Sequence, residues 1–468
     1  MRGISQTGFN LSIKRNYVIV IGYILLIALA WRFIPHPVIV FAAGLVPLAV
    51  LFVLRFPFQM VLLFVVFSFF RLHEVFPQLY PLKVPLLLSL ASLAALIWHI
   101  GLTKKIQMFW RPELTWMTVF FVLVLIGVIM ASNRPIAIAY FKGIYWKIAI
   151  MTFAIAWLTR SEKDFAFAAK LITLSGIAVG CVALFNKANG LEMVEETRVT
   201  IGRSIGSVLG DPNDLALVLM FPAAFAIALI LNKGLGKFAF VMGIIGAPVL
   251  FMAIIATQSR GGLLGILAVF GIFAYRKIKS KALFFILGAV AMVVLYAVAG
   301  ISDRASGGAA EEGIDASAMG RLYAWEAAFG MALHNPLTGV GVDNFYSNYY
   351  YYSQHWDGLN HAVHSTWFGV LAETGFLGLI VFLIIIGHLL NTAYKTLISL
   401  ERLQRQGHTI PPALLAVTQA VYAGMLGTIV SATFLTQGFT WPIYILAALI
   451  VAVAQWHHIF VKDKLKYD

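Results

Sequence analysis

The sequence has very little charge, few acidic residues and almost no cysteine. Only 12% of its 468 residues are Asp, Glu, Lys or Arg, whereas 61% are hydrophobic and the mean hydropathy is +0.88. No soluble core could hide that much apolar surface, so the composition excludes a soluble globular protein. The single cysteine, Cys181, excludes an intrachain disulfide. The sequence therefore predicts an all-α polytopic integral membrane protein.

Signatures of nucleotide and metal chemistry are also missing. The chain has no P-loop, no dinucleotide-binding glycine motif, no Asp-x-Asp pair and no cluster of Cys or His ligands. We therefore expect no cofactor, no metal and no use of ATP or a nucleotide sugar. Asp211, Asn213 and Asp214 are acidic or amide residues that could serve a metal. However, a Pro-Asn-Asp sequence before an apolar run is typical of a helix N-terminus, and we prefer that interpretation.

Long apolar runs account for most of the chain. Runs of about 17 to 25 residues span a bilayer, and they predict 12 to 14 transmembrane helices here. The candidate spans are residues 17–34, 37–54, 57–70, 84–100, 114–131, 141–159, 165–186, 213–231, 238–257, 261–275, 282–300, 366–394, 412–435 and 441–458.

The net charge of +14 raises the question of a nucleic-acid partner, but the positions of the basic residues argue against one. With a cytoplasmic N-terminus, most Lys and Arg residues fall between spans on the cytoplasmic side, as the positive-inside rule requires. We therefore expect both termini in the cytoplasm, membrane lipid as the surroundings and no nucleic acid. The exceptions, outside or within spans, include Arg198, Arg203, Arg260, Arg304 and Arg321.

This topology divides the chain into five parts. Residues 1–186 form N-terminal transmembrane helices, 187–212 a first outer loop, 213–300 central transmembrane helices, 301–364 a large outer loop and 365–468 C-terminal transmembrane helices. Both loops and Arg260 fall on the same, non-cytoplasmic side. Loops on one face of a rigid scaffold can converge into a site.

The large outer loop contains elements of its own. Apolar residues at helical spacing predict an amphipathic helix over residues 318–333, which Asn335 and Pro336 end. A tyrosine-rich run over residues 346–352, followed by Trp356, is typical of an interfacial aromatic belt or of a surface on which sugars stack.

Three polar islands set guanidinium and imidazole groups beside apolar spans, at residues 198–214, 258–262 and 361–378. Arginine offers planar, bidentate donors and keeps its proton, which suits an anion. A neutral histidine can take a proton from a hydroxyl group. Each arginine could instead snorkel or cap a helix, and Arg321 could pair with Glu326 or Asp315. The islands together favour a site that grips an anion and moves a proton.

The islands also carry spaced motifs. Residues 320–325 read Gly-Arg-Leu-Tyr-Ala-Trp, residues 334–345 contain His-Asn-Pro and Gly-Val-Gly-Val-Asp-Asn-Phe, and residues 364–375 begin His-Ser-Thr-Trp and end Glu-Thr-Gly. In content and spacing they resemble the signature of the O-antigen ligase and polymerase superfamily. Residues 210–216 and 258–262 are similar to its two upstream blocks.

The resemblance covers roughly residues 198–378. Further towards the N-terminus, residues 71–81 resemble the branch of O-glycosylation ligases that is associated with exosortase systems. What the superfamily implies is a metal-independent glycosyltransferase of GT-C type with a large periplasmic loop in the bacterial inner membrane. Such an enzyme passes a glycan from an undecaprenyl-pyrophosphate carrier to an acceptor hydroxyl on the periplasmic face.

The resemblance carries the family's histidine onto His364, not His361, and implies that His364 is the catalytic base. Arginine charge is needed because the pyrophosphate leaving group is anionic. Gly261 and Gly262 would let a phosphate approach the backbone where a helix begins, beside Arg260. The residues expected to bind the pyrophosphate are Arg203, Arg260 and Arg321, with Arg198 in reserve, and those expected to support the site are His361, Glu373 and Asn213.

Two other functions compete with a ligase. A polymerase of the same superfamily would use the same site and a growing polymer as acceptor. A transporter or flippase of lipid-linked glycans would place ionisable residues deep inside spans and need no base; only Lys142, Lys147, Lys170 and Glu373 fit that description. The N-terminal resemblance favours a ligase, and the acceptor stays open among a protein, a lipid-anchored sugar and a polymer.

Overall fold

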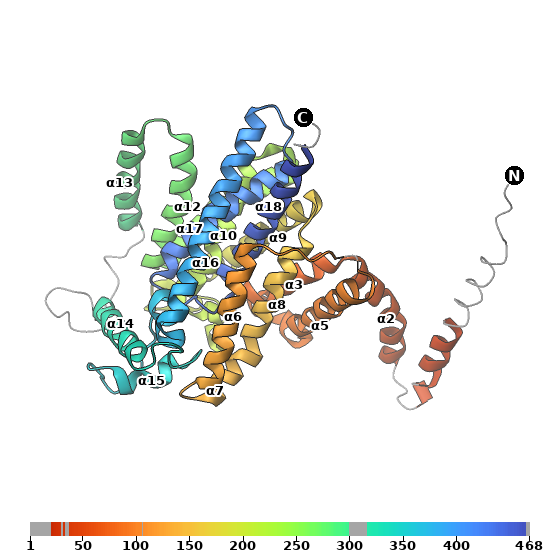
Figure 1. Cartoon of the computed structure of the whole chain (residues 1–468), viewed down its shortest axis with the longest axis horizontal. Helices are drawn as coiled ribbons and strands as arrows, with labels where there is room; N and C mark the ends of the chain where they lie inside the picture. The colour runs from red at the N-terminus through yellow and green to blue at the C-terminus, as the bar shows by residue number, and fades with distance from the viewer. Residues whose placement is uncertain (1–19, 30, 33–36, 105, 299–315, 465–468) are drawn as a thin grey trace.

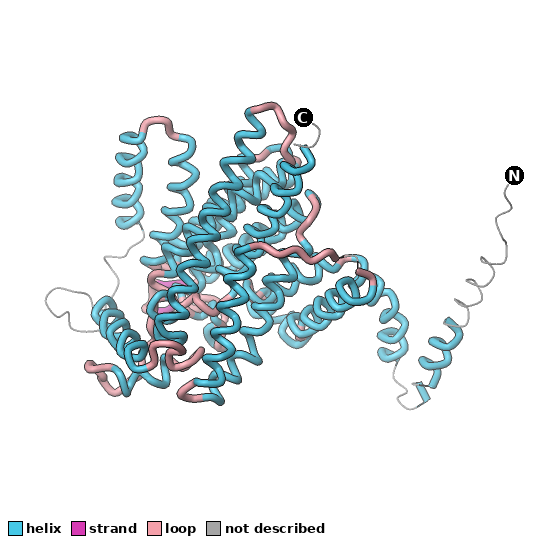
Figure 2. Tube along the Cα trace, viewed as in Figure 1, coloured by secondary structure: helices cyan, strands magenta, loops and turns pink. Residues whose placement is uncertain are grey.

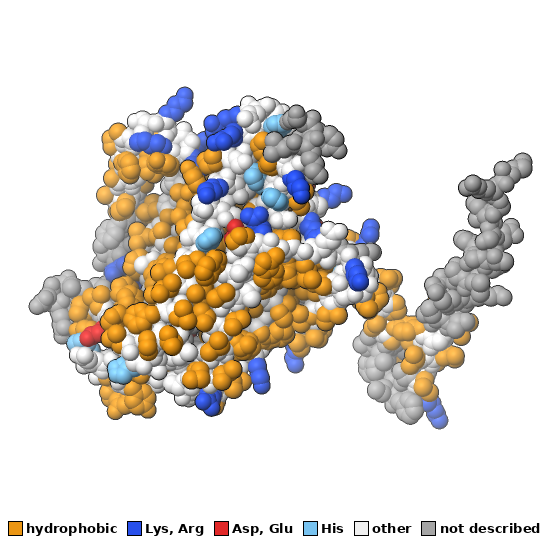
Figure 3. Space-filling view, in the orientation of Figure 1, with side chains coloured by type: hydrophobic (Ala, Val, Ile, Leu, Met, Phe, Trp, Pro, Cys, Tyr) orange, Lys and Arg blue, Asp and Glu red, His pale blue; other side chains and the backbone are white. Residues whose placement is uncertain are grey.

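The computed structural model is almost entirely helical (Figures 1 and 2). It describes residues 20–464, apart from residues 30, 33–36, 105 and 299–315. Within those residues, nine helices are long and apolar enough to cross a membrane. Hydrophobic side chains form a broad band across one face, and Lys and Arg gather near the end where the C-terminus lies (Figure 3). The prediction of an all-α polytopic membrane protein is confirmed.

The first half of the chain is a series of helices joined by short connections. Its elements are α2 (Pro37–Arg55), α3 (Pro57–Phe69), α4 (Leu72–Val75), η1 (Pro77–Leu82), α5 (Val84–Ile97), η2 (Trp98–Leu102), α6 (Pro112–Met130), α7 (Arg134–Tyr140), η3 (Phe141–Tyr145), α8 (Trp146–Leu158) and α9 (Glu162–Ala188).

The second half adds a small hairpin and the longest helix. Its elements are β1 (Met193–Val194), β2 (Arg198–Val199), η4 (Arg203–Ile205), η5 (Val208–Gly210), α10 (Pro212–Leu231), η6 (Lys233–Leu235), α11 (Lys237–Ala256), α12 (Arg260–Lys277), α13 (Lys281–Val298), α14 (Ala316–His334), α15 (Phe345–Tyr352), α16 (Thr366–Arg405), α17 (Pro412–Ala432) and α18 (Trp441–Lys464).

Several predicted spans have a different form in the structure. Spans 37–54 and 57–70 are α2 and α3, which are bent by 95° where Pro57 follows Phe56, so they count as one broken span at most. Span 261–275 is α12, whose charged ends leave it outside the nine. Span 282–300 falls on a shorter apolar helix, and span 17–34 falls partly outside the described residues. Hydropathy predicted the positions of the helices more accurately than the number of membrane spans.

Helix α10 is the centre of the bundle and packs against α9, α11, α12 and α17. Small residues let these helices approach closely, as in other membrane bundles. A Cβ atom on Gly262 of α12 would lie 2.5 Å from Cβ of Ala216 on α10. Our expectation that Gly262 makes room for a phosphate therefore needs correction, because α10 occupies that space.

The described parts of the two long loops, residues 187–212 and 316–364, are folded. Residues after α9 form an antiparallel hairpin in which β1 pairs with β2, an element that the sequence did not predict. Helix α14 confirms the helix predicted over residues 318–333, and Pro336 follows its end. Residues 301–315 of the large loop lie outside the described part of the chain.

The turn after α14 docks into a bend in α16. Helix α16 continues well beyond the predicted end at residue 394, and it is interrupted at Gly375, which has φ 70° and ψ −173°. There the amide of Val340 donates to the carbonyl of Ala372 (2.8 Å), and the amide of Phe376 donates to the carbonyl of Pro336 (2.8 Å). These two bonds attach the outer loop to the membrane bundle.

Gly339 makes this contact possible, so we expect Gly339→Ala to destabilise the protein. Its φ is +60°, and a Cβ atom would lie 2.3 Å from the carbonyl oxygen of Ala372. The left-handed backbone alone costs about 1–3 kcal/mol for a non-glycine residue. Thermal unfolding of the purified protein should show a clearly lower Tm. Gly271→Ala is the control, since its Cβ meets nothing within 4 Å; equal Tm values for both variants would contradict the docking role.

Candidate functional site

His364 lies immediately before α16 in a strained backbone conformation. Its φ is +44°, which is uncommon for a residue with a side chain and is often found at functional sites. The residue before it is fixed from α14, because Nε1 of Trp325 donates to the carbonyl of Val363 (3.1 Å). The Trp325 ring also stacks on Phe368 in the first turn of α16, with centroids 5.0 Å apart. Helix α14 is thereby held beside His364.

Burial and charged groups from three segments affect the pKa of the His364 imidazole. Burial lowers its pKa from the ordinary value of 6.5, and the charges of Arg321 and His361 lower it further. The carboxylate of Asp211 acts in the opposite direction and is the weaker influence next to burial and Arg321. His364 is therefore neutral at neutral pH, which is the form that can accept a proton.

Arg321 reaches this position through the periodicity of α14. It precedes Trp325 by four residues, so the two side chains lie on the same face of the helix. Its side chain is half-buried. Of the two competing partners, Glu326 lies 3.5 Å from His355, and Asp315 lies outside the described residues. Arg321 is close enough to His364 for its charge to lower the pKa of the imidazole.

Arg260 is the first residue of α12 and is half-buried. Ser259 precedes it as the N-cap, and its hydroxyl accepts a hydrogen bond from the amide of Gly262 (3.2 Å). Gln258 has φ +48°, so the chain turns sharply into the helix. A helix N-terminus with an arginine at its first position favours anions through both the helix dipole and the guanidinium charge.

Arg198 has a different environment from the one expected of a spare phosphate ligand. It is only 4% exposed, and its Nε donates to the carbonyl of Thr257 (3.1 Å). Its Nη2 donates to Oδ1 of Asn213 (3.0 Å), an oxygen that also accepts from the hydroxyl of Ser259 (2.9 Å). Arg198 and Asn213 therefore connect the β-hairpin to the outer ends of α10 and α12.

Arg203 remains accessible. It is exposed on η4, and its Nη1 donates to the carbonyl of Gly210 (3.2 Å) while its backbone amide donates to the carboxylate of Glu192 (2.8 Å). The glycine at position 210 is needed here, since a Cβ atom would lie 2.9 Å from Cα of Arg203. The η4–η5 turn thus presents Arg203 beside the start of α10.

Asp211 is the N-cap of α10, as the sequence predicted. Its carboxylate accepts from the amides of Asn213 (2.7 Å) and Asp214 (3.3 Å). Among the residues that the structure describes, no group of three or more His, Cys, Asp or Glu side chains is close enough to share a metal ion.

Glu373 and His361 are placed around the site, not in its centre. Oε1 of Glu373 accepts from the amide of Phe345 (3.2 Å), so this buried carboxylate caps α15 from within α16. His361 Nε2 lies 2.9 Å from the carboxylate of Asp357, and this hydrogen bond lowers the pKa of Asp357. Side chains of the predicted tyrosine-rich run, such as Tyr351, and Trp356 are exposed nearby.

Sequence reasoning missed the connection between α17 and α18. Gln437 donates through Nε2 to Oδ1 of Asp214 (3.0 Å) and through its amide to Oγ1 of Thr366 (2.9 Å). It thereby joins the first turn of α10 to the first turn of α16, beside His364. The polar run at residues 433–440 between the last two apolar spans was the signal that could have identified it.

These observations define a multi-pass helical membrane protein with a neutral histidine and several arginines at one end of its bundle. Residues 245–383 match the model of a family described as O-antigen ligase. This match confirms the resemblance to the O-antigen ligase superfamily over that region and supports membrane glycosyl transfer of ligase or polymerase type, from a lipid-linked glycan to an acceptor. No curated protein matches the chain.

The matched range contains Arg260, Arg321, His364 and Glu373. It begins well after residues 71–81, so the exosortase association stays a prediction.

We expect Asn213 to be a structural residue whose acceptor oxygen matters. Asn213→Ala removes one of the acceptors that the buried Arg198 guanidinium uses and should lower stability by about 1–3 kcal/mol. Asn213→Asp keeps an acceptor for both Arg198 and Ser259 and should retain the wild-type Tm. Thermal unfolding of the two variants in detergent provides the comparison. A wild-type Tm for Asn213→Ala would contradict this role.

Proposed function

We propose that this protein is an O-antigen ligase-like glycosyltransferase. It transfers a glycan from undecaprenyl pyrophosphate to an acceptor hydroxyl on the periplasmic side, without a metal. The observation that carries the proposal is the meeting of Arg321 with a neutral, half-buried His364 inside the region that matches the O-antigen ligase model. Displacement of a pyrophosphate by a hydroxyl group requires a base for the hydroxyl proton and a permanent positive charge for the leaving group.

The reaction is a direct displacement at the anomeric carbon. The acceptor oxygen attacks that carbon while its proton passes to the unprotonated ring nitrogen of His364. The bond between the anomeric carbon and the pyrophosphate oxygen breaks, and its electron pair leaves with undecaprenyl pyrophosphate. Arg260 and Arg321 meet the negative charge that collects on the leaving group, and Arg203 reaches it from the η4–η5 turn.

The remaining candidates position these groups. Arg198 and Asn213 fix the outer ends of α10 and α12, and so the places of Arg203 and Arg260. Glu373 holds the turn that follows α14. His361 orients substrate from the rim, where Asp357 fixes its ring. Arg198 serves the site through this network, because it is buried and donates to Thr257 and Asn213.

The sides of the membrane follow from charge. Arg276, Lys277 and Arg405 lie at the ends of α12 and α16 that are opposite the histidine. By the positive-inside rule that end is cytoplasmic, which supports cytoplasmic termini, a periplasmic site and the five-part division of the chain. A bacterial inner membrane supplies the carrier lipid. Residues 71–81 favour a ligase over a polymerase.

Removing the base tests the chemistry. We expect His364→Ala to lower glycan transfer about 10²–10⁴-fold while binding of the undecaprenyl-pyrophosphate donor persists. The assay uses purified protein, the lipid-linked oligosaccharide, candidate acceptors and a chelator. The control is His334→Ala, because His334 is exposed, its Nδ1 bonds to the carbonyl of Gly330 in its own helix (2.9 Å) and its ring packs edge-on against Tyr352, away from His364 in the sequence.

Transfer by His364→Ala at the wild-type rate would overturn the assignment of the base. Loss of wild-type transfer on chelation would overturn metal independence. The acceptor that is used distinguishes a ligase from a polymerase.

The pH dependence tests the pairing of Arg321 with His364. The neutral imidazole is the active form, so activity should be full above the lowered pKa and fall as the pH drops through it, below 6.5. Arg321→Gln removes a charge that lowers this pKa, so the fall in activity at acidic pH should begin at a higher pH. The rate itself should also fall. Arg402→Gln, at the other end of the bundle, should leave the pH of this fall unchanged. An unchanged pH in Arg321→Gln would show that the two groups do not interact.

A further inference from the structure

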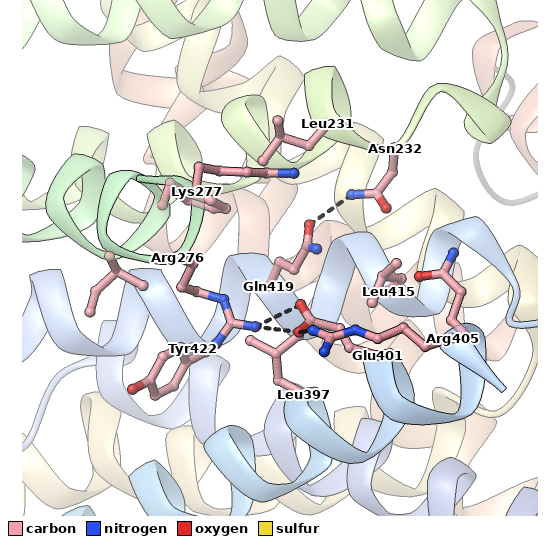
Figure 4. Close-up of a pocket in the computed structure, with 13 residues that line it drawn as sticks. Leu231, Asn232, Arg276, Lys277, Leu397, Glu401, Arg405, Leu415, Gln419 and Tyr422 are labelled. Carbon is pink, nitrogen blue, oxygen red and sulfur yellow. Dashed lines mark hydrogen bonds and ion pairs between the residues drawn. The ribbon is translucent and has the colours of Figure 1, made fainter. Parts of the chain in front are cut away.

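A cavity lies at the end of the bundle opposite His364, and the proposed reaction does not use it. Its volume is about 360 Å³, and it is lined by Asn232 and by residues of α10, α12, α16 and α17 (Figure 4). Part of its wall is apolar, with Leu231, Ile272, Phe273, Leu397 and Leu415. The remainder is polar or charged and includes Asn232, Arg276, Lys277, Glu401, Gln404, Arg405 and Gln419.

The charges that line the cavity are mainly positive. Arg276, Lys277 and Arg405 contribute three positive charges and Glu401 one negative charge, which leaves a net charge of +2. Both oxygens of Glu401 already lie 2.6 Å from Nη2 of Arg276, and Arg405 Nη2 is 3.9 Å from the same carboxylate. Because a single nitrogen of Arg276 makes both bonds, its other N–H groups are left for a ligand.

The uncharged groups add donors. Oε1 of Gln419 accepts from Nδ2 of Asn232 (2.9 Å), and this fixes the side-chain amide of Gln419 with its NH₂ group as the remaining donor. The Lys277 side chain extends across the cavity in the direction of Asn232 (Figure 4). Within the described residues, its ammonium group takes part in no hydrogen bond or ion pair. A site with this surplus of donors and positive charge suits a phosphate group, which offers only acceptors at neutral pH.

We propose that this cavity binds the phosphate of an anionic phospholipid headgroup. The phosphate ester is held by Lys277, Arg405 and the free donors of Arg276, and the start of the acyl chains lies on the apolar part of the wall. Soluble phosphate has the same charged group but makes no use of Leu231, Phe273 or Leu397. The location agrees with a lipid, since basic pockets between helices on the cytoplasmic side are where anionic headgroups collect.

A lipid bound in this cavity connects α12 and α16, whose opposite ends lie at Arg260 and near His364. Arg276 and Lys277 end α12, which begins with Arg260, and Arg405 ends α16, which begins beside His364. The Arg276–Glu401 pair already connects these helices. A phosphate that contacts both cationic ends adds a second connection.

The test measures lipid binding by the purified full-length protein in detergent. Native mass spectrometry follows binding of dioleoyl phosphatidylglycerol and dioleoyl phosphatidylcholine, and thermal unfolding follows the effect of each lipid and of inorganic phosphate. The test variant is Lys277→Gln with Arg405→Gln. Arg276 is kept, because its removal would leave Glu401 unpaired. The control is Lys279→Gln with Arg402→Gln, which makes the same change of net charge at exposed positions outside the cavity.

Wild-type protein and the control should prefer phosphatidylglycerol to phosphatidylcholine and gain in Tm only from the former. The test variant should bind phosphatidylglycerol at least about tenfold more weakly, because it loses two charge-assisted contacts. Equal binding of the two lipids, or an unchanged affinity in the test variant, overturns the proposal. A Tm gain from inorganic phosphate that equals the gain from phosphatidylglycerol, and that the test variant loses, overturns the lipid as occupant and identifies soluble phosphate as the ligand.

Discussion

The site depends on the backbone pairing between the turn after α14 and the bend in α16. The turn contributes Pro336 and Val340, and the bend contributes Ala372 and Phe376, through two bonds of 2.8 Å. A continuous helix has no spare backbone groups for such pairing, because each amide and carbonyl is used within the helix. The interruption at Gly375 supplies them. The turn after α14 is thereby attached to α16.

Once the turn is fastened, the rest of the site follows from short-range geometry. Trp325 holds α14 against Val363 and Phe368, and Arg321, one turn earlier in α14, lowers the pKa of His364 through its charge. A separate network centred on Oδ1 of Asn213 connects Arg198 to Ser259, the residue before Arg260. Each of the two long loops thus supports part of the arginine-containing site that we propose. Preorganised charge of this kind is what stabilises a developing anion.

Much of the fold could be predicted from the sequence, because apolar length and periodicity are local properties. The positions of the spans, helix α14 and the N-cap at Asp211 all follow from neighbouring residues. The role of Arg198 could not be predicted in this way, since its partners Thr257 and Asn213 are distant in the sequence. The hydrogen bond between Asp214 and Gln437 joins residues that are even further apart in the sequence. Gly262 was predicted to face a phosphate, and only the packing of α10 against α12 shows that it faces Ala216.

The most direct test of the account is the affinity of the purified protein for undecaprenyl pyrophosphate in the presence of EDTA. The account predicts that wild-type protein binds without divalent metal and that Arg260→Lys binds at least about tenfold more weakly, since lysine cannot form the bidentate contact. His364→Ala should bind like wild type, because the base acts on the acceptor. Wild-type affinity in Arg260→Lys, or loss of all binding in EDTA, would contradict the arginine site proposed for the carrier.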